Sequence, residues 1–441
     1  MPEIRPFRAL RYDPEVVGDV ARVVAPPYDV ISPALRAALA ARSARNVVRI
    51  DLPVTEPADT DPDDRYRRAG HLYVSWRSDG TLRKDPRPSI YAYEQTYTVP
   101  GSDVTRLQRG FFARLRLEPF GPDSGIRPHE RTLAAPKEDR YKLTRATGAN
   151  LSPIVALYEE PSGRAGRLLA QVAARPAALD IMDDDGVRQR LWPVAADGTE
   201  TGPADQLIAL AGAAPVTIAD GHHRYETALR YRNERRRGAA SESDPAYDYV
   251  LALFFESSEE LAVLATHRIV RGLGDPASAA LLDACGCCFE VERVEDAVAL
   301  AASFAPAAVG RGGEGRLGLW TRAGGAILRA RRDALEPLLP PGGEALRRLD
   351  VTVLQAALQA LAGIDPAAIA AGERVAYTKS AMEAIEAVSS RADGADAAFL
   401  LEPTPVAEIA AVAAAGDVMP QKSTYFYPKA LTGLVINPFE W

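Results

Sequence analysis

Cysteine is scarce in this sequence. Its 441 residues include three cysteines, all in the run Cys285-Gly286-Cys287-Cys288. An odd number of cysteines argues against a disulfide framework, and this spacing, with no histidine close by, does not match a zinc site. We interpret the run as small apolar residues that lead into a strand.

Long hydrophobic runs and an excess of basic residues are also missing. The sequence has no stretch of about 18 uncharged apolar residues, and its first residues, Met1-Pro2-Glu3-Ile4-Arg5-Pro6, lack the apolar run of a signal peptide. The net charge of −7 argues against a protein that coats nucleic acid, because such affinity comes from lysine and arginine neutralising phosphates. We expect a cytoplasmic protein whose partners are small molecules, and neither a membrane nor nucleic acid.

The composition is that of a globular protein, with 47% hydrophobic and 25% charged residues. A single core stops growing well below this chain length, so we expect several lobes. The spacing of apolar residues predicts a mixed α/β (α+β) fold. We divide it into an N-terminal mixed region with a β hairpin (1–160), a core (161–260) and a C-terminal α/β region (261–441).

The periodicity of apolar residues predicts the individual elements. Helical spacing predicts a helix over 63–78, and alternation predicts a hairpin between 89–99 and 106–117. The polar stretch 121–147 is expected to be irregular, and strands and helices alternate beyond it, as in parallel α/β units. The other principal predictions are strands at 154–158, 188–194, 215–218, 248–256 and 434–436 and helices at 163–174, 204–211 and 222–236.

The run Asp220-Gly221-His222-His223-Arg224 is the strongest candidate site. It joins a predicted strand to a predicted helix, so a tight turn places a helix N-terminus beside the end of a strand. Free N–H groups and the positive end of the helix dipole bind anions there, and Gly221 leaves room for phosphate oxygens. Arg224 can grip a phosphate with its guanidinium fork, while Asp220 can orient a histidine, accept a proton or hold a metal ion.

Two other interpretations of this run remain open. In the first, Asp220 is an N-cap and the histidines are surface groups. In the second, His222 and Glu226, four residues apart, face one metal ion, although no H-E-x-x-H signature is present. Two histidines and an arginine in one helical turn, in a chain with five histidines, favour a functional site. We rank phosphate binding above a protein-bound metal.

A second polar cluster covers 126–132 and 136–142. It places one carboxylate beside one histidine, with separate cations, which is the mixture that acid–base chemistry on a phosphorylated substrate requires. The alternative is a solvated charged surface, the usual role of such runs. We predict Glu130 as the general base. The cluster also supplies predicted phosphate ligands, Lys137 and Arg140, and a substrate contact, His129, to which we add Asn150.

The C-terminal tail contains a third candidate, Lys422-Ser423-Thr424, between two prolines and beside three aromatic residues. Its ammonium and hydroxyl groups can bind phosphate. The glycines of a Walker motif are absent, so this is not a P-loop. A strap that packs its aromatic rings on the core is an equally good interpretation, and both can hold together.

With these clusters in view, the chain resembles a widespread bacterial and archaeal family known mainly as a domain of unknown function. The resemblance covers nearly the whole chain. The run D-G-H-H-R is also similar to the signature of the ParB/sulfiredoxin-like superfamily, which implies a core of that type over 161–260 that binds nucleotide or other phosphates. The stretches that carry the family resemblance are APPYDVIS at 25–32, HERT and PKEDRYKL within 129–143, ANLSPI at 149–154, IADGHHRYETAL at 218–229 and MPQKSTYFYPK at 419–429.

That superfamily includes free L-serine kinases, which carry a closely similar run. The resemblance implies that Asp220, His222, His223 and Arg224 take donor-phosphate and substrate positions. We therefore expect a phosphotransferase that makes O-phosphoserine, or phosphorylates a similar hydroxyl, from ATP, ADP or pyrophosphate, with Mg²⁺ carried by the donor and Asp220 as its candidate protein contact. A ParB-like nucleotide-binding switch, a phosphate-ester hydrolase and a homodimer stay open.

Overall fold

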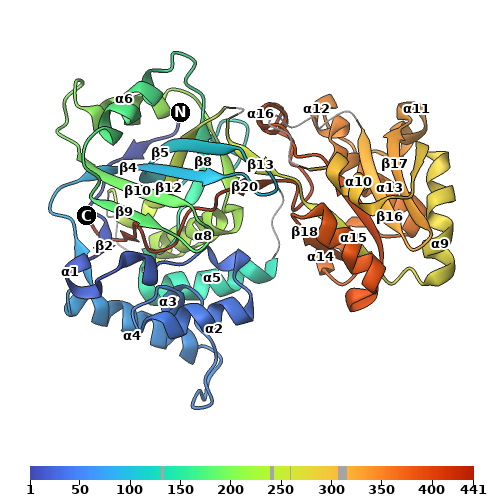
Figure 1. Cartoon of the computed structure of the whole chain (residues 1–441). Helices are drawn as coiled ribbons and strands as arrows, with labels where there is room; N and C mark the ends of the chain where they lie inside the picture. The colour runs from blue at the N-terminus through green and yellow to red at the C-terminus, as the bar shows by residue number, and fades with distance from the viewer. Residues whose placement is uncertain (131–133, 239–242, 259, 306–314) are drawn as a thin grey trace.

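The structure is a computed structural model, and it describes residues 1–130, 134–238, 243–258, 260–305 and 315–441. The chain forms two lobes that lie side by side, and both termini lie on the larger one (Figure 1). Each lobe is built on its own β-sheet with helices packed against it. The predicted mixed α/β class is confirmed.

The larger lobe is organised around a nine-stranded sheet with the order β6-β11-β8-β12-β5-β4-β10-β9, and β1 pairs with β5 beside this path. The predicted hairpin is present as β4 and β5. β8 runs parallel to β12 and β6 to β11, whereas the other pairs are antiparallel. The strands are β1 (Ile4–Arg5), β4 (Ser89–Thr98), β5 (Thr105–Arg116), β6 (Ile126–Pro128), β8 (Ile154–Tyr158), β9 (Leu179–Met182), β10 (Arg188–Ala195), β11 (Val216–Asp220) and β12 (Tyr249–Glu256).

Both faces of this sheet are buried. Ile90 and Ala92 of β4 belong to a core that helices α6 and α7 complete, and Tyr91 and Tyr93, which point the other way, belong to a core completed by α4. The helix predicted over 63–78 is α4. The helices and short strands of this lobe include α1 (Pro14–Val17), α2 (Pro33–Arg42), α3 (Val48–Asp51), α4 (Asp64–Ser78), α6 (Arg164–Ala173), α7 (Pro203–Ala211), α8 (His222–Gly238), β2 (Leu10–Tyr12) and β3 (Leu82–Lys84).

The smaller lobe contains a six-stranded antiparallel sheet with the order β15-β17-β16-β19-β14-β18. Helices α9 and α13 contribute to the core on one face, and α10 and α15 to the core on the other. Cys285 and Cys288 are buried just before β15, as expected for residues that lead into a strand. The strands and α-helices are β14 (His267–Arg271), β15 (Phe289–Val294), β16 (Arg316–Thr321), β17 (Gly324–Ala330), β18 (Val375–Thr378), β19 (Ala395–Leu401), α9 (Asp275–Ala284), α10 (Ala297–Ser303), α11 (Arg332–Leu335), α12 (Glu344–Arg348), α13 (Asp350–Ala362), α14 (Pro366–Ala371), α15 (Ala381–Ser390) and α16 (Val406–Ala414).

The chain crosses between the lobes twice, and the two crossings pair with each other. β13 (Ala262–Leu264) leads into the smaller lobe, and β20 (Tyr425–Tyr427), antiparallel to it, leads back. We call residues 419–429, which include β20, the C-terminal strap. Beyond the strap the tail follows the larger lobe, where β21 (Asn437–Pro438) pairs with β7 (Ala149–Asn150).

Two predictions of local structure are wrong. The apolar run 434–436 is buried, but it is not a strand, because the backbone turns after Gly433 (φ 92°) and β21 begins only at Asn437. The stretch 121–147 is not irregular throughout, since α5 (Ala134–Thr147) occupies its second half. Charged residues of α5 pair with neighbouring elements, as Lys142 does with Asp63. The apolar spacing by which a helix is recognised in a sequence is therefore weak in this segment. No helix in the described part of the chain is long and apolar enough to cross a membrane.

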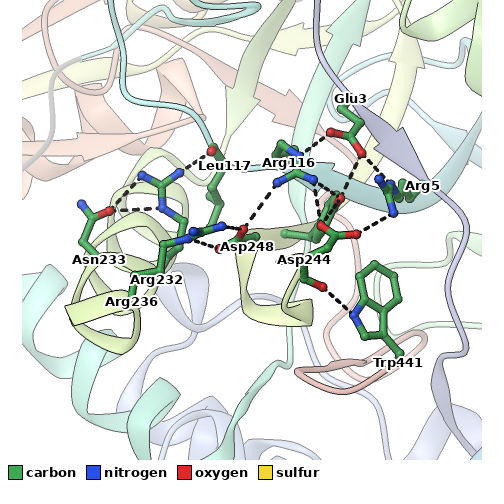
Figure 2. A network of polar contacts seen from close by, with 11 residues as sticks. Glu3, Arg5, Arg116, Leu117, Arg232, Asn233, Arg236, Asp244, Asp248 and Trp441 are labelled. Carbon is green, nitrogen blue, oxygen red and sulfur yellow. Dashed lines mark hydrogen bonds and ion pairs between the residues drawn. The ribbon is translucent and has the colours of Figure 1, made fainter. Parts of the chain in front are cut away.

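A network of ion pairs holds the C-terminal end of α8 (Figure 2). Buried Asp248 accepts hydrogen bonds from Arg236 of α8, whose Nε lies 2.8 Å away, and from Arg116 at the end of β5. Arg116 also binds Asp244 at 2.8 Å and Glu3 near the N-terminus. The helix that carries the candidate site is therefore fixed to the sheet at its far end.

We expect the substitution Asp248→Asn to lower the free energy of unfolding by about 1–3 kcal/mol, because it removes the charge that two arginines share at a buried position. Denaturation in urea measures this change. Asp123→Asn, at an exposed residue, is the matched control and should change stability by less than about 0.5 kcal/mol. Equal stability of the two variants would contradict this role of Asp248.

Candidate functional site

A cavity of about 320 Å³ lies where the two lobes and the C-terminal strap meet. The larger lobe contributes Tyr28 and Asp29, Glu130 and the first turn of α8. The smaller lobe contributes Thr266 and the end of β18 with Lys379. The strap contributes Gln421, Lys422, Thr424, Tyr425 and Lys429. The volume falls within the range of small-molecule sites.

The turn between β11 and α8 forms one wall of this cavity. The strand ends at Asp220, Gly221 has a φ of 89°, and the helix begins at His222, so the predicted strand–turn–helix is confirmed. The positive φ of Gly221 would strain any other residue, and a Cβ atom at this position would also lie only 3.0 Å from Nε of Arg224. The first N–H groups of a helix lack acceptors within the helix, and here the residues that bear them line the cavity.

Asp220 is held between two cations. One of its oxygens pairs with Nζ of Lys429 in the strap, and the other with the guanidinium of Arg224 one turn into α8. Burial alone would raise the pKa of Asp220, but Lys429 and Arg224 hold it well below the ordinary range. Arg224 also donates to Oγ of Ser152 at 2.7 Å and to the carbonyl of Pro153. Its two terminal nitrogens thus serve protein acceptors, and the phosphate fork predicted for Arg224 is engaged within the fold.

Two histidines lie against each other behind this wall. Nδ1 of His129 donates to the carbonyl of Ile218, which leaves Nε2 to accept from Oγ1 of Thr424 at 2.9 Å. The backbone N–H of His129 donates to Nε2 of His222 at 3.2 Å. Burial lowers the pKa of His129 to about 4 and that of His222 well below its usual value. Both rings are therefore neutral at pH 7, and His129 binds the strap from behind the cavity.

Glu130 is a second carboxylate that contacts the strap. Its Oε1 accepts a hydrogen bond of 2.8 Å from the backbone N–H of Lys422, a residue in the left-handed region with a φ of 56°. The carbonyl of Lys422 accepts from buried Arg268 of the smaller lobe at 3.1 Å. Burial raises the pKa of Glu130 to about 7, against the opposing effect of Lys422. A carboxyl group whose pKa lies near neutral pH can both take up and release a proton.

Several predicted site residues do not line the cavity. Lys137 forms an ion pair with Glu226, so Glu226 faces a cation where the metal hypothesis placed an ion shared with His222. Arg140 is buried and donates to the carbonyl of Asp51 at 2.6 Å. Its guanidinium lies 4.2 Å from the centre of the Tyr28 ring, so it supports a cavity residue from outside.

Asn150 and Ser423 also have structural partners. Oδ1 of Asn150 accepts from the backbone of Leu251 at 3.0 Å and from Asn437 at 2.9 Å. Ser423 is buried, and its hydroxyl donates to the carbonyl of Pro420. The structure brings Glu130, Asp220, Gly221, His222, His223, Arg224, Lys422 and Thr424 together at the cavity. Arg131 and Thr132 of the second polar cluster lie outside the described residues, and among those described no group of three or more His, Cys, Asp or Glu side chains is arranged to hold a metal ion.

Other cavity residues were missed in the sequence. Asp29 and Lys429 stand within the stretches at 25–32 and 419–429 that carry the family resemblance, and that was the signal that could have found them. Lys379 and Tyr377 follow no motif, and only the pairing of β14 with β18 brings them to the cavity.

Comparisons with known proteins give one family and several distant structures. No curated protein matches the chain. Similar solved structures include a conserved hypothetical protein from Pyrococcus furiosus, at 15% identity and a TM-score of 0.32 over 68% of this chain and 87% of that one. They also include a free serine kinase variant in complex with AMP, at 13% and 0.34 over 68% and 84%, and SbnI with a C-terminal truncation from Staphylococcus aureus, at 13% and 0.34 over 70% and 83%. Similarity at this level carries no argument about function. The model of the family described as "Protein of unknown function (DUF1015)" matches residues 4–352.

The ion pairs of Asp220 predict a dependence of stability on pH. At pH 7 the substitution Asp220→Asn should lower the free energy of unfolding by about 3–5 kcal/mol, because it leaves Lys429 and Arg224 without their shared partner. Because the pKa of Asp220 is lowered in the folded chain, its ionised carboxylate stabilises the fold fully at pH values above the pKa of an unfolded aspartate, about 4. This stabilisation is lost progressively as the pH falls below about 4. Urea denaturation from pH 7 to pH 3 should show the gap between variant and wild type narrowing below about pH 4. A gap that stays constant over this range would contradict the assignment.

Proposed function

The chain belongs to the family of proteins of unknown function DUF1015, and from the geometry of its cavity we propose that it is a small-molecule phosphotransferase. The acceptor is a hydroxyl group, with free L-serine as the leading candidate, and the donor is ATP, ADP or pyrophosphate. We propose serine as the acceptor because the D-G-H-H-R run resembles the corresponding run of free serine kinases. The cavity supports the type of reaction.

The observation that carries this proposal is that Glu130 and several cationic groups line the same cavity. The pKa of Glu130 is raised to about 7, and Lys422, Lys429 and the N-terminus of α8 surround the same space. Phosphoryl transfer demands mainly positioning and neutralisation of phosphate charge, with a base for the attacking hydroxyl. These groups supply both requirements.

In the proposed reaction Glu130 accepts the proton of the acceptor hydroxyl. The hydroxyl oxygen bonds to the terminal phosphorus of the donor as the bond from that phosphorus to the leaving oxygen breaks. Lys422 and the N-terminus of α8 neutralise the charge on the phosphoryl oxygens, and Lys429, fixed by Asp220, adds to the positive field. Glu130 releases its proton to solvent after the product leaves.

Mg²⁺ would enter this site with the donor, where it neutralises phosphate charge. Asp220 does not suit such an ion, because each of its oxygens already pairs with a cation. Asp29 suits it better, since its carboxylate is exposed, lines the same cavity and forms no ion pair with any described residue. We therefore assign the protein contact of the donor's metal ion to Asp29.

The first test is a screen of the purified chain with L-serine and each donor, with O-phosphoserine as the product measured. We expect Glu130→Gln to lower kcat by about 10²- to 10⁴-fold, because it removes the base while it keeps the size of the side chain. Glu138→Gln, at an exposed glutamate that pairs with Arg230, is the matched control and should keep full activity. Absence of phosphoserine with every donor would reject the proposal. Release of inorganic phosphate without phosphoserine would point to a hydrolase.

The second test is the pH dependence of the reaction. Because Glu130 acts as a base only when it is ionised, kcat should rise with pH through about 7 and then level off. A profile of kcat against pH from pH 5.5 to 8.5 measures this rise. A rate that is flat over this range, or that falls as Glu130 ionises, would assign the proton transfer to another group.

A further inference from the structure

Lysine is rare in this chain, and half of its lysines line the cavity. The sequence has six lysines among 52 basic residues. Lys379, Lys422 and Lys429 all belong to the nineteen residues that line the cavity. The other three form ion pairs elsewhere: Lys84 with Glu440, Lys137 with Glu226 and Lys142 with Asp63. Such a concentration in a small fraction of the chain indicates a local need for ammonium groups.

The ammonium groups of two of the three cavity lysines form no ion pair with a carboxylate of the described residues. Lys429 is paired with Asp220, whereas Lys379 and Lys422 form no ion pair in that part of the chain. Nζ of Lys379 donates to the hydroxyl of Tyr425 at 3.2 Å and lies 4.4 Å from the centre of its ring. Nζ of Lys429 lies 4.4 Å from the centre of the same ring. Asp220 balances the charge of Lys429, whereas no described carboxylate forms an ion pair with Lys379 or Lys422, so a bound anion would balance these two charges.

Lys379 and Lys422 belong to different parts of the molecule. Lys379 directly follows β18 of the smaller lobe. Lys422 lies in the strap, and its backbone N–H is held by Glu130 of the larger lobe. An anion that contacts both lysines therefore lies between the smaller lobe and the strap. An ammonium group is a compact charge on a flexible stem, which suits phosphate oxygens whose position is not fixed by the protein.

We propose that Lys379 and Lys422 together bind the phosphate chain of a di- or triphosphate, so that the donor is held across the two lobes. Each lysine contacts oxygens of a different phosphoryl group. Lys379 is then a donor-binding residue that the smaller lobe contributes to the site. The role of this polyphosphate as a phosphate donor rests on the proposed function, whereas its binding by the two lysines does not.

The test is calorimetric titration of the full chain with inorganic pyrophosphate and with inorganic phosphate, in the absence of any acceptor. Wild type should bind pyrophosphate more tightly than phosphate. Lys379→Met should weaken the affinity for pyrophosphate by about 10- to 100-fold, as expected for the loss of one charge-assisted contact. Lys379→Arg should retain most of the affinity. Lys84→Met, at a lysine far from the cavity in sequence and paired with Glu440, is the matched control and should bind pyrophosphate like wild type.

The outcomes separate this inference from the proposed function. Unchanged pyrophosphate affinity in Lys379→Met overturns the inference, whether or not the chain forms phosphoserine. Weakened affinity in a chain that forms no phosphoserine supports the inference and rejects the kinase. Equal weakening in Lys379→Met and Lys84→Met would show a general effect of net charge and would also overturn it. Lys379 is exposed, and thermal melting of each variant checks that its fold is intact.

Discussion

The pairing of Asp220 with Lys429 and Arg224 is the interaction on which the arrangement of the cavity depends. It joins the end of β11, the first turn of α8 and the C-terminal strap at one buried carboxylate. Charges removed from water are stable only when they are paired, so these three segments are fixed relative to one another. The ion-pair network around Asp248 fixes the other end of α8 (Figure 2).

The position of the strap follows from this constraint and creates most of the remaining site. Once Lys429 is held, the preceding residues of the strap lie along 129–130, where Thr424 meets His129 and the N–H of Lys422 meets Glu130. The same strap pairs with β13 at the crossing between the lobes. The strap therefore lines the cavity and also forms one of the two crossings between the lobes.

Arginine and lysine have different tasks in this molecule. Arg114, Arg140 and Arg224 are buried or nearly so, and their planar guanidinium groups each serve several fixed protein acceptors. Lys379 and Lys422 line the cavity, and their ammonium groups form no ion pair within the described residues. This difference follows from the geometry of the two groups, and it explains why Arg140 and Arg224, expected as phosphate ligands, support the site from within the fold.

Local sequence was sufficient for the mixed α/β class, for the hairpin of β4 and β5 and for the turn between β11 and α8, because periodicity and turn residues act over a few positions. It also pointed to Glu130 and Lys422, which stand in unusual polar runs. It could not show that Lys379 joins them, that Arg140 turns inward toward Asp51, or that 434–436 bends. Those outcomes depend on which distant segments pack together, and the energies that decide them come from burial and ion pairs between residues hundreds of positions apart.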